Sequence, residues 1–118
     1  MSTLVYGIPN CSTVKLARDW LEAQGVAYTF YDYKKQGVPA DRLDDWIASV
    51  GWDVLVNRKG TTWRKLDDTA KASVVDAPSA KALMLANASV IKRPVIEKDG
   101  KVVSVGFDPL TLAGRLAG

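Results

Sequence analysis

Residues 5–15 of this chain read Val5-Tyr6-Gly7-Ile8-Pro9-Asn10-Cys11-Ser12-Thr13-Val14-Lys15. The apolar residues at 4–6 predict a short buried strand, which Gly7 and Pro9 end in a turn. The polar residues around Cys11 are of the types that cap helices, so a helix should begin within a residue or two of that position. The stretch therefore predicts a strand, a turn and a helix, with the chain's single cysteine at the turn.

This setting makes Cys11 a candidate nucleophile. A thiol at a helix N-terminus lies among free backbone N–H groups at the positive end of the helix dipole, and both lower the cysteine pKa. Asn10 and Ser12 flank the thiol, and Lys15 adds a positive charge if its side chain folds back by one turn. The alternative is that Cys11 is a small core residue, which is the usual fate of an unpaired cysteine.

The next segment predicts a helix and a second strand. Apolar residues within 13–24 recur at helical spacing, and Gly25 follows where a helix commonly ends. Residues 26–33 are rich in aromatic and branched side chains, so a strand parallel to the first is expected there. Its tyrosines could stack on bases or pack on the sheet with their hydroxyls in solvent. The absence of a basic, aromatic RNA-binding motif favours sheet packing.

Helices are predicted for the middle of the chain. One should open at Pro39 or Asp41, another stretch at 67–75 is weakly helical, and residues 76–79 signal a fresh helix start. Between them, residues 57–65 are basic. This segment is either a solvated polar loop or a set of guanidinium and N–H donors for an anion.

The end of the chain predicts a hairpin and a last helix. Residues 95–97 and 102–105 are strand candidates around Asp99-Gly100, a strong hairpin signal, and a helix should start at 108–109. This order of elements predicts an α/β domain over residues 1–118, with a four-stranded mixed sheet flanked by helices. The inserted helical subdomain is expected at about residues 39–90.

Composition limits the class of protein. Hydrophobic residues make up 47% and charged residues 25% of the chain, and no apolar run reaches membrane-spanning length. No secretory signal is visible and a lone cysteine cannot form an internal disulfide, so a cytoplasmic protein is expected. A monomer is expected as well. A net charge of +3 does not indicate nucleic acid binding. With no histidine and one cysteine, histidine-assisted catalysis and cysteine- or histidine-rich metal sites are excluded, so no bound metal or cofactor is expected.

Three stretches of the chain resemble one protein family. Residues 6–15 are similar to the active-site loop of the glutaredoxin-type arsenate reductase superfamily. Residues 57–66 and the run Ile91-Lys92-Arg93-Pro94-Val95 match it as well, in the same order. The sequence Gly-Thr-Thr-Trp-Arg-Lys-Leu at 60–66 is most similar to the YffB-type branch, described as glutathione-dependent thiol reductases, and the Spx transcription regulators are a sister branch.

The resemblance implies a thioredoxin-like fold and assigns the site. It makes Cys11 the nucleophile and Arg93 the arginine that precedes a cis-proline, Pro94, beside the cysteine. The arsenate-reducing members hold their oxyanion with three arginines. Here Asn57 aligns with the second of these, with Arg58 next to it. Val105 and Gly106 stand in the region of the third, so the resemblance implies that arsenate is a poor substrate.

The resemblance favours a monothiol reductase that uses glutathione as its co-substrate, with glutaredoxin as a further candidate partner. Arg93 and Arg58, joined by Arg64 or Lys65, are expected to bind glutathione carboxylates or a substrate anion, and Pro94 to hold the extended tripeptide. Two alternatives stay open beside arsenate reduction. One is an Spx-like regulator that binds RNA polymerase without the Cys-x-x-Cys switch, since Val14 occupies the partner position, and the other is a catalytically silent relative.

Overall fold

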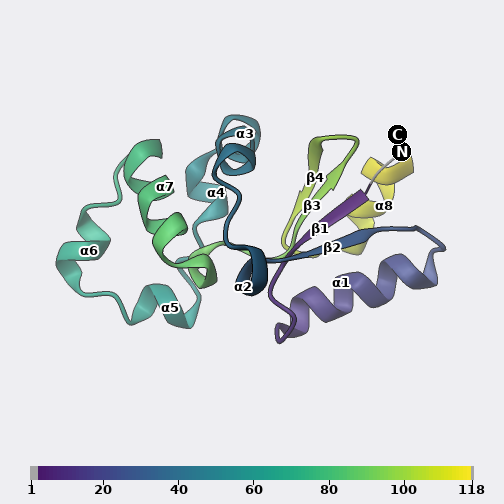
Figure 1. Ribbon diagram of the computed structural model, residues 1–118, viewed down its shortest axis with the longest axis horizontal. Helices are drawn as coiled ribbons and strands as arrows, with labels where there is room; N and C mark the ends of the chain where they lie inside the picture. The colour runs from purple at the N-terminus through teal and green to yellow at the C-terminus, as the bar shows by residue number, and fades with distance from the viewer. Residues whose placement is uncertain (1–2, 118) are drawn as a thin grey trace. The chain divides into compact units, whose positions relative to one another are not determined.

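The computed structural model describes residues 3–117, which form two compact units. The first unit comprises residues 3–36 and 93–117 and contains the sheet, and the second comprises residues 37–92 and is helical (Figure 1). The chain thus leaves the first unit after Gln36 and returns to it at Arg93, on either side of the insertion expected at about residues 39–90.

The sheet of the first unit is mixed and four-stranded, as predicted. β1 (Thr3–Gly7) pairs in parallel with β2 (Thr29–Asp32), and helix α1 (Ser12–Ala23) connects the two. On its other side β1 pairs antiparallel with β3 (Val95–Lys98), which pairs antiparallel with β4 (Lys101–Val105). The strand order is therefore β2-β1-β3-β4, with β1 in the interior of the sheet.

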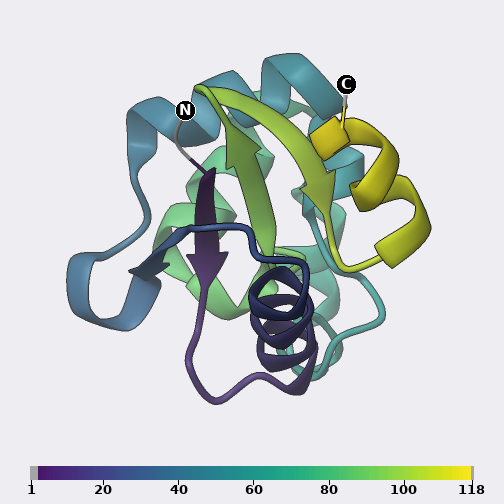
Figure 2. The ribbon, with the colours of Figure 1, turned by 90° about the vertical axis from the view of Figure 1, so that its right-hand side faces the viewer.

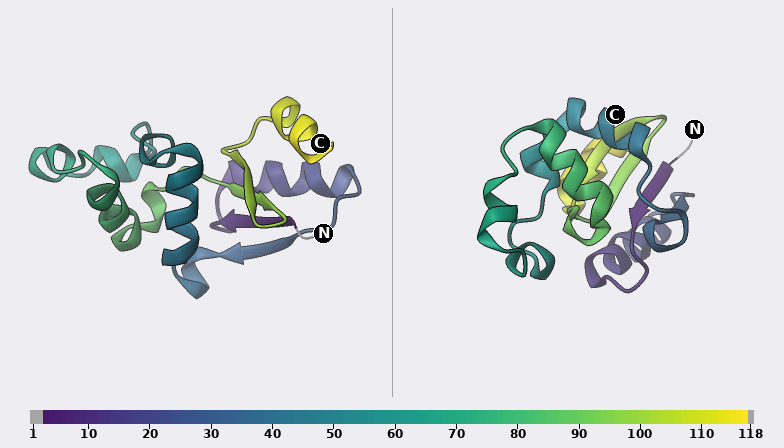
Figure 3. Two further views of the ribbon diagram at one scale, coloured as in Figure 1. Left: turned by 90° about the horizontal axis from the view of Figure 1, so that it is seen from above. Right: turned by 60° about the vertical axis from the view of Figure 1, so that its left-hand side comes forward.

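One face of this sheet carries the apolar core of the unit. α1 and the last helix, α8 (Pro109–Ala117), lie on the same side of the strands (Figures 2 and 3). Alternate strand residues face them, because side chains along a strand point to opposite faces in turn. The fully buried members of the cluster are Val5, Ala17, Leu21, Ile96 and Leu112.

The sequence correctly predicted the bounds of α1. Its buried residues, Val14, Ala17 and Leu21, recur at helical spacing on one face. The last helical residue is Ala23, and the C-cap is Gln24. Gly25 then turns the chain out of the helix, with a φ of +71°, a left-handed conformation that glycine adopts without strain. The predicted helix start next to Cys11 is confirmed as well.

The second strand is shorter than predicted. A strand was expected over residues 26–33, but only Thr29–Asp32 pair with β1, and Tyr33 begins a short helix, α2 (Tyr33–Gln36). At the start of the segment the Val26 N–H donates to the carbonyl of Leu21, which holds it against the end of α1. At its end the Asp32 carboxylate accepts from the Lys34 N–H at 2.8 Å and turns the chain.

The predicted hairpin is confirmed. Asp99 and Gly100 have φ of +54° and +81°, which is the pair of left-handed conformations that a two-residue type I′ turn requires. Asp99 is the only non-glycine residue among 3–117 with positive φ, and aspartate tolerates that conformation better than most side chains.

The second unit consists of short helices. They are α3 (Ala40–Val50), α4 (Trp52–Leu55), α5 (Thr61–Arg64), α6 (Asp68–Ala72), α7 (Ala77–Ala86) and the 3-10 helix η1 (Ala88–Val90). The starts of two helices, predicted near Pro39 and near Asp76, are confirmed. Helix α6 is shorter than the helical stretch predicted at 67–75. Within the basic segment, residues 61–64 form a short helix. None of the helices within residues 3–117 is long and apolar enough to cross a bilayer.

Gly7 ends β1 where the strand closely approaches α1, and its replacement tests this packing. A Cβ at Gly7 would lie 2.8 Å from Cγ2 of the fully buried Val14. We expect Gly7→Ala to lower the free energy of unfolding by about 1–3 kcal/mol, as overpacked sites do. Denaturant unfolding measures the change. The control is Gly114→Ala in α8, where a Cβ meets nothing within 4 Å and should be neutral or stabilising, and equal stabilities of the two variants would contradict the prediction.

Candidate active site

Cys11 is the N-cap residue of α1. Its backbone is extended, with φ of −109° and ψ of 123°, and its carbonyl accepts the first helical hydrogen bond, from the Lys15 N–H at 3.0 Å. The side chain is partly exposed and makes no capping hydrogen bond of ordinary geometry. The N–H groups of Thr13 and Val14 still act on the sulfur and lower its pKa, because a thiolate accepts longer and weaker hydrogen bonds than an oxygen does.

Arg93 is the side chain that the fold brings to this sulfur. The peptide bond between Arg93 and Pro94 is cis, which confirms the prediction. Tyr6 pairs with Val95 across the sheet, so one further step of the antiparallel pairing places Pro94 beside Gly7, where the active-site turn begins. From this position the Arg93 side chain lowers the pKa of the Cys11 thiol through hydrogen bonding and through its positive charge.

The surroundings of Cys11 favour its thiolate. Partial burial is the largest single effect and acts to raise the pKa of the thiol. It is outweighed by the combined effect of Arg93, through hydrogen bonding and charge, and of the backbone N–H groups of Val14 and Thr13. The pKa of Cys11 therefore lies below its ordinary value. A larger fraction of the sulfur is then in the nucleophilic form at neutral pH.

The other residues predicted around the thiol differ in their surroundings. Asn10 and Ser12 flank Cys11 and are exposed. Lys15 is exposed too, and it lines a pocket along α1 together with Pro9 and Arg18. Lys15 is not among the groups that lower the pKa of Cys11, which are Arg93 and two backbone N–H groups. Val14, at the position of a second cysteine in the Spx regulators, is fully buried.

A cluster of buried polar side chains on the sheet was not predicted from the sequence. The Tyr6 hydroxyl donates to Glu97 Oε1 at 3.0 Å, and both side chains are buried. Tyr33 is also buried, so the expectation that the tyrosine hydroxyls reach solvent was wrong for it. Burial raises the pKa of Tyr33 well above its ordinary value, Tyr6 adds to the effect, and the charge of Arg93 opposes it. An acidic residue inside the apolar strand at 95–98 was the signal that could have indicated this group.

Asn57 and Arg58 lie in the second unit. The Asn57 side-chain oxygen accepts from the Lys59 N–H at 3.2 Å, which is the geometry of a local turn. The Arg58 guanidinium lies over the rings of Trp52 and Trp63, at 5.5 and 5.8 Å from their centroids. Arg64 and Lys65 are exposed in the same unit, and the role of these residues in binding an anion stays a prediction.

The site in the first unit supports thiol chemistry. It offers one sulfur of lowered pKa, one guanidinium that favours the thiolate, and backbone donors at a helix N-terminus. Within residues 3–117 no three histidine, cysteine or acidic side chains gather in a way that could hold a metal ion. An activated thiolate and an external thiol are sufficient for disulfide exchange.

Comparison with known proteins gives concordant matches along nearly the whole chain. Residues 6–113 match the model of the ArsC family. The chain is 47% identical in sequence to a YffB protein of solved structure, and the two superpose with a TM-score of 0.91. The match covers 98% of this chain and 99% of the YffB chain.

Two further relatives extend this result. The solution structure of an arsenate reductase (ArsC) related protein from Brucella melitensis is 52% identical, with a TM-score of 0.76 over 97% of this chain and 93% of its own. A Haemophilus influenzae protein is 42% identical over 104 residues, which cover 88% of this chain and 90% of that protein.

Proposed function

The chain belongs to the ArsC family and has its thioredoxin-like fold, and from that premise we propose that it is a glutathione-dependent monothiol reductase. The observation that carries the proposal is the single cysteine at the N-terminus of α1, whose pKa is lowered by Arg93 and by backbone N–H groups of the helix. Such a thiolate is able to attack a disulfide. The attack forms a mixed disulfide with Cys11, and because the chain has no second cysteine, an external thiol must resolve that disulfide.

The reaction then proceeds by two exchanges. The Cys11 thiolate attacks the glutathione sulfur of a mixed disulfide, a Cys11–glutathione disulfide forms, and the substrate leaves as a thiolate that takes up a proton. A second glutathione, as its thiolate, attacks the glutathione sulfur of that adduct. Glutathione disulfide forms and the Cys11 thiolate is released. In total one reduced glutathione is consumed, the substrate sulfur is released as a thiol, and the glutathionyl group of the substrate leaves joined to the glutathione that was consumed.

Arg93 has two roles in this proposal. It lowers the pKa of Cys11 and so favours the thiolate, and its positive charge attracts the carboxylates of glutathione. The segment at Pro94, next to the turn that carries the thiol, is assigned to the extended peptide of glutathione. Asn57 and Arg58, which belong to the second unit, are proposed as anion-binding residues of that unit.

Mass spectrometry after incubation with glutathione disulfide tests the proposal. We expect one glutathione per chain, located at Cys11, and its complete removal by reduced glutathione. Turnover is then measured with a glutathionylated peptide, with formation of glutathione disulfide coupled to glutathione reductase. A thiol that stays unmodified in the first experiment would rule the function out.

Arsenate should be reduced only slowly. An oxyanion with several negative charges needs several charge-assisted hydrogen bonds. Gly106, in the region of the third arginine of arsenate reductases, donates its N–H to the Pro94 carbonyl at 2.8 Å, and Val105 pairs with Val95, so uncharged residues stand there beside the cis-proline. The check is a coupled assay of arsenate and of a glutathionylated peptide with the same enzyme. Arsenate turnover equal to that of the peptide would contradict the prediction.

A further inference from the structure

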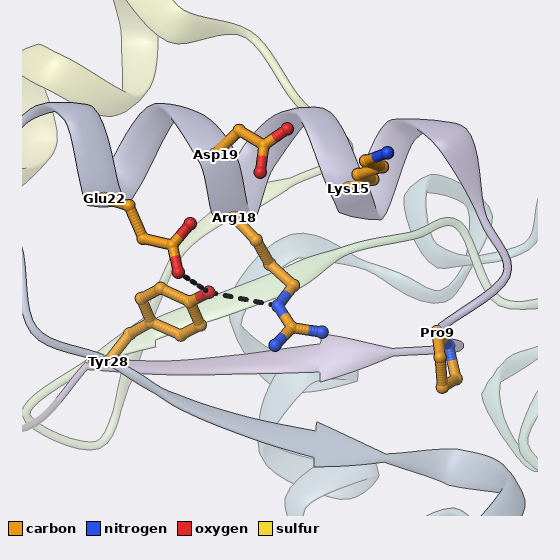
Figure 4. A pocket seen from close by; sticks show the side chains of 6 residues that line it. All are labelled: Pro9, Lys15, Arg18, Asp19, Glu22 and Tyr28. Carbon is orange, nitrogen blue, oxygen red and sulfur yellow. Dashed lines mark hydrogen bonds between the residues drawn. The ribbon is translucent and has the colours of Figure 1, made fainter.

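A pocket of about 340 Å³ lies along α1 next to the active-site turn (Figure 4). Residues of the turn, of α1 and of the segment before β2 form its wall, and all of them belong to the first unit. The lining residues are Pro9, Lys15, Arg18, Asp19, Glu22 and Tyr28. Pro9 precedes Cys11 by two positions and Lys15 follows it by one helical turn, so the pocket begins at residues of the chain on either side of the cysteine.

Arg18 is held in place inside this pocket. Its Nε donates to the Tyr28 hydroxyl at 3.0 Å, and its guanidinium lies 4.2 Å from the centroid of the Phe30 ring (Figure 4). Both contacts leave the Nη groups unused, since among residues 3–117 Arg18 makes no other hydrogen bond and no ion pair. A guanidinium fixed in this way presents donors to a carboxylate with little loss of side-chain entropy on binding.

The opposite charge is present in the same pocket. Glu22 accepts from the Tyr28 hydroxyl through Oε1 at 3.3 Å, and Asp19 is exposed (Figure 4). Two basic and two acidic side chains therefore line one cavity. An inorganic polyanion would be attracted by the two basic side chains and repelled by the two acidic ones. The complementary ligand carries a carboxylate and an ammonium group close together, as the head of an α-amino acid does.

Resting on the proposed function, we infer that this pocket binds the γ-glutamyl head of the glutathione that is joined to Cys11. That head is a free α-amino acid group at the end of a flexible arm. The arm spans about two residue lengths, or about 7 Å. Lys15 and Arg18 lie about 6 and 10 Å along α1 from Cys11, and helix side chains lean toward the N-terminus, so both cations are within reach.

The test compares two disulfides that differ only in this head. One is glutathione disulfide. The other is the disulfide of N-acetylcysteinylglycine, which keeps the amide and the glycine carboxylate but lacks the α-amino acid group. The rate constants for adduct formation at Cys11 are measured by quenched mass spectrometry and expressed as a ratio, in which changes of the thiol pKa cancel. We expect the wild-type chain to favour glutathione disulfide.

Removal of the pocket charges should reduce that preference. Arg18→Gln should lower the ratio about five-fold, the effect of a charge-assisted hydrogen bond weakened by solvent exposure. Lys15→Gln should lower it less, because the ammonium of an exposed lysine is more mobile. The matched control is Lys101→Gln, at an exposed lysine of β4, whose ratio should equal that of the wild type. Arg18→Lys keeps the charge and serves if Arg18→Gln does not fold, as judged by circular dichroism.

The outcomes separate this inference from the proposed function. Adducts with both disulfides and an unchanged ratio in the Arg18 and Lys15 variants would overturn the pocket assignment and leave the reductase intact. No adduct of the wild-type chain with either disulfide would overturn both. A lowered ratio in both variants, with Lys101→Gln unchanged, supports the γ-glutamyl site.

Discussion

Cys11→Ser should abolish the glutathione adduct while the fold stays intact. The hydroxyl of serine is not ionised at neutral pH and forms no disulfide, so neither exchange step can occur. The stability of the domain should not fall, because Cys11 is partly exposed and its side chain makes no ordinary capping bond. Serine is among the preferred N-cap residues, and its hydroxyl is placed to accept from the first turn of α1. We therefore expect the free energy of unfolding to stay equal or to rise by up to about 1 kcal/mol.

The two readouts of this variant are independent. Mass spectrometry after incubation with glutathione disulfide measures the adduct, and denaturant unfolding measures the stability. Wild-type chain that has been alkylated beforehand is the control for glutathione bound without a covalent bond. An adduct on the Cys11→Ser variant would contradict the assignment of the nucleophile, and a large loss of stability would show that the cysteine is a core residue after all.

Much of the fold was predictable because local residues decide it. The N-terminus of α1, its end at Gly25 and the turn at Asp99-Gly100 each depend on the conformations that a few neighbouring residues favour. The cis bond before Pro94 is different, since the residues alone indicate only an extended pair, and the family resemblance supplied the prediction.

The length of β2 was not predictable from its own composition. The aromatic run at 26–33 suits a strand throughout, but a residue becomes part of a sheet only where a partner strand is present. β1 offers a partner from Leu4 to Gly7, and these four residues pair with Thr29–Asp32. The residues on either side bond to α1 or turn into α2 instead.

The position of the candidate nucleophile in the fold was predictable, and its surroundings were less so. The setting of Cys11 was visible in adjacent residues, whereas the approach of Arg93 to the sulfur depends on the pairing of β1 with β3. The hydrogen bond from Arg18 to Tyr28 likewise joins a helix to the segment before a strand. No periodic pattern in the sequence reports a polar contact between two elements, and for that reason the pocket along α1 was not predicted.

Arg93→Ala should make Cys11 a weaker acid and a slower nucleophile at neutral pH. In the wild-type chain the hydrogen bond and the charge of Arg93 hold the pKa of Cys11 below its ordinary value, so the thiolate persists as the pH falls below the ~8.5 of a free cysteine. Without the guanidinium, partial burial opposes ionisation more effectively. The loss of one charge-assisted hydrogen bond at a partly exposed site corresponds to about a ten-fold slower reaction at pH 7.

The rate of alkylation by iodoacetamide, measured from pH 5 to about pH 10, tests this effect directly. The midpoint for Arg93→Ala should move to higher pH. Well above it the two rates should converge or cross, because a thiolate of higher pKa is intrinsically the better nucleophile. Arg115→Ala, at an exposed arginine of α8, is the matched control and should follow the wild-type curve. Superimposed profiles for Arg93→Ala and the wild type would show that Arg93 does not act on the sulfur, whereas a loss of rate that persists at high pH would indicate a distorted turn instead.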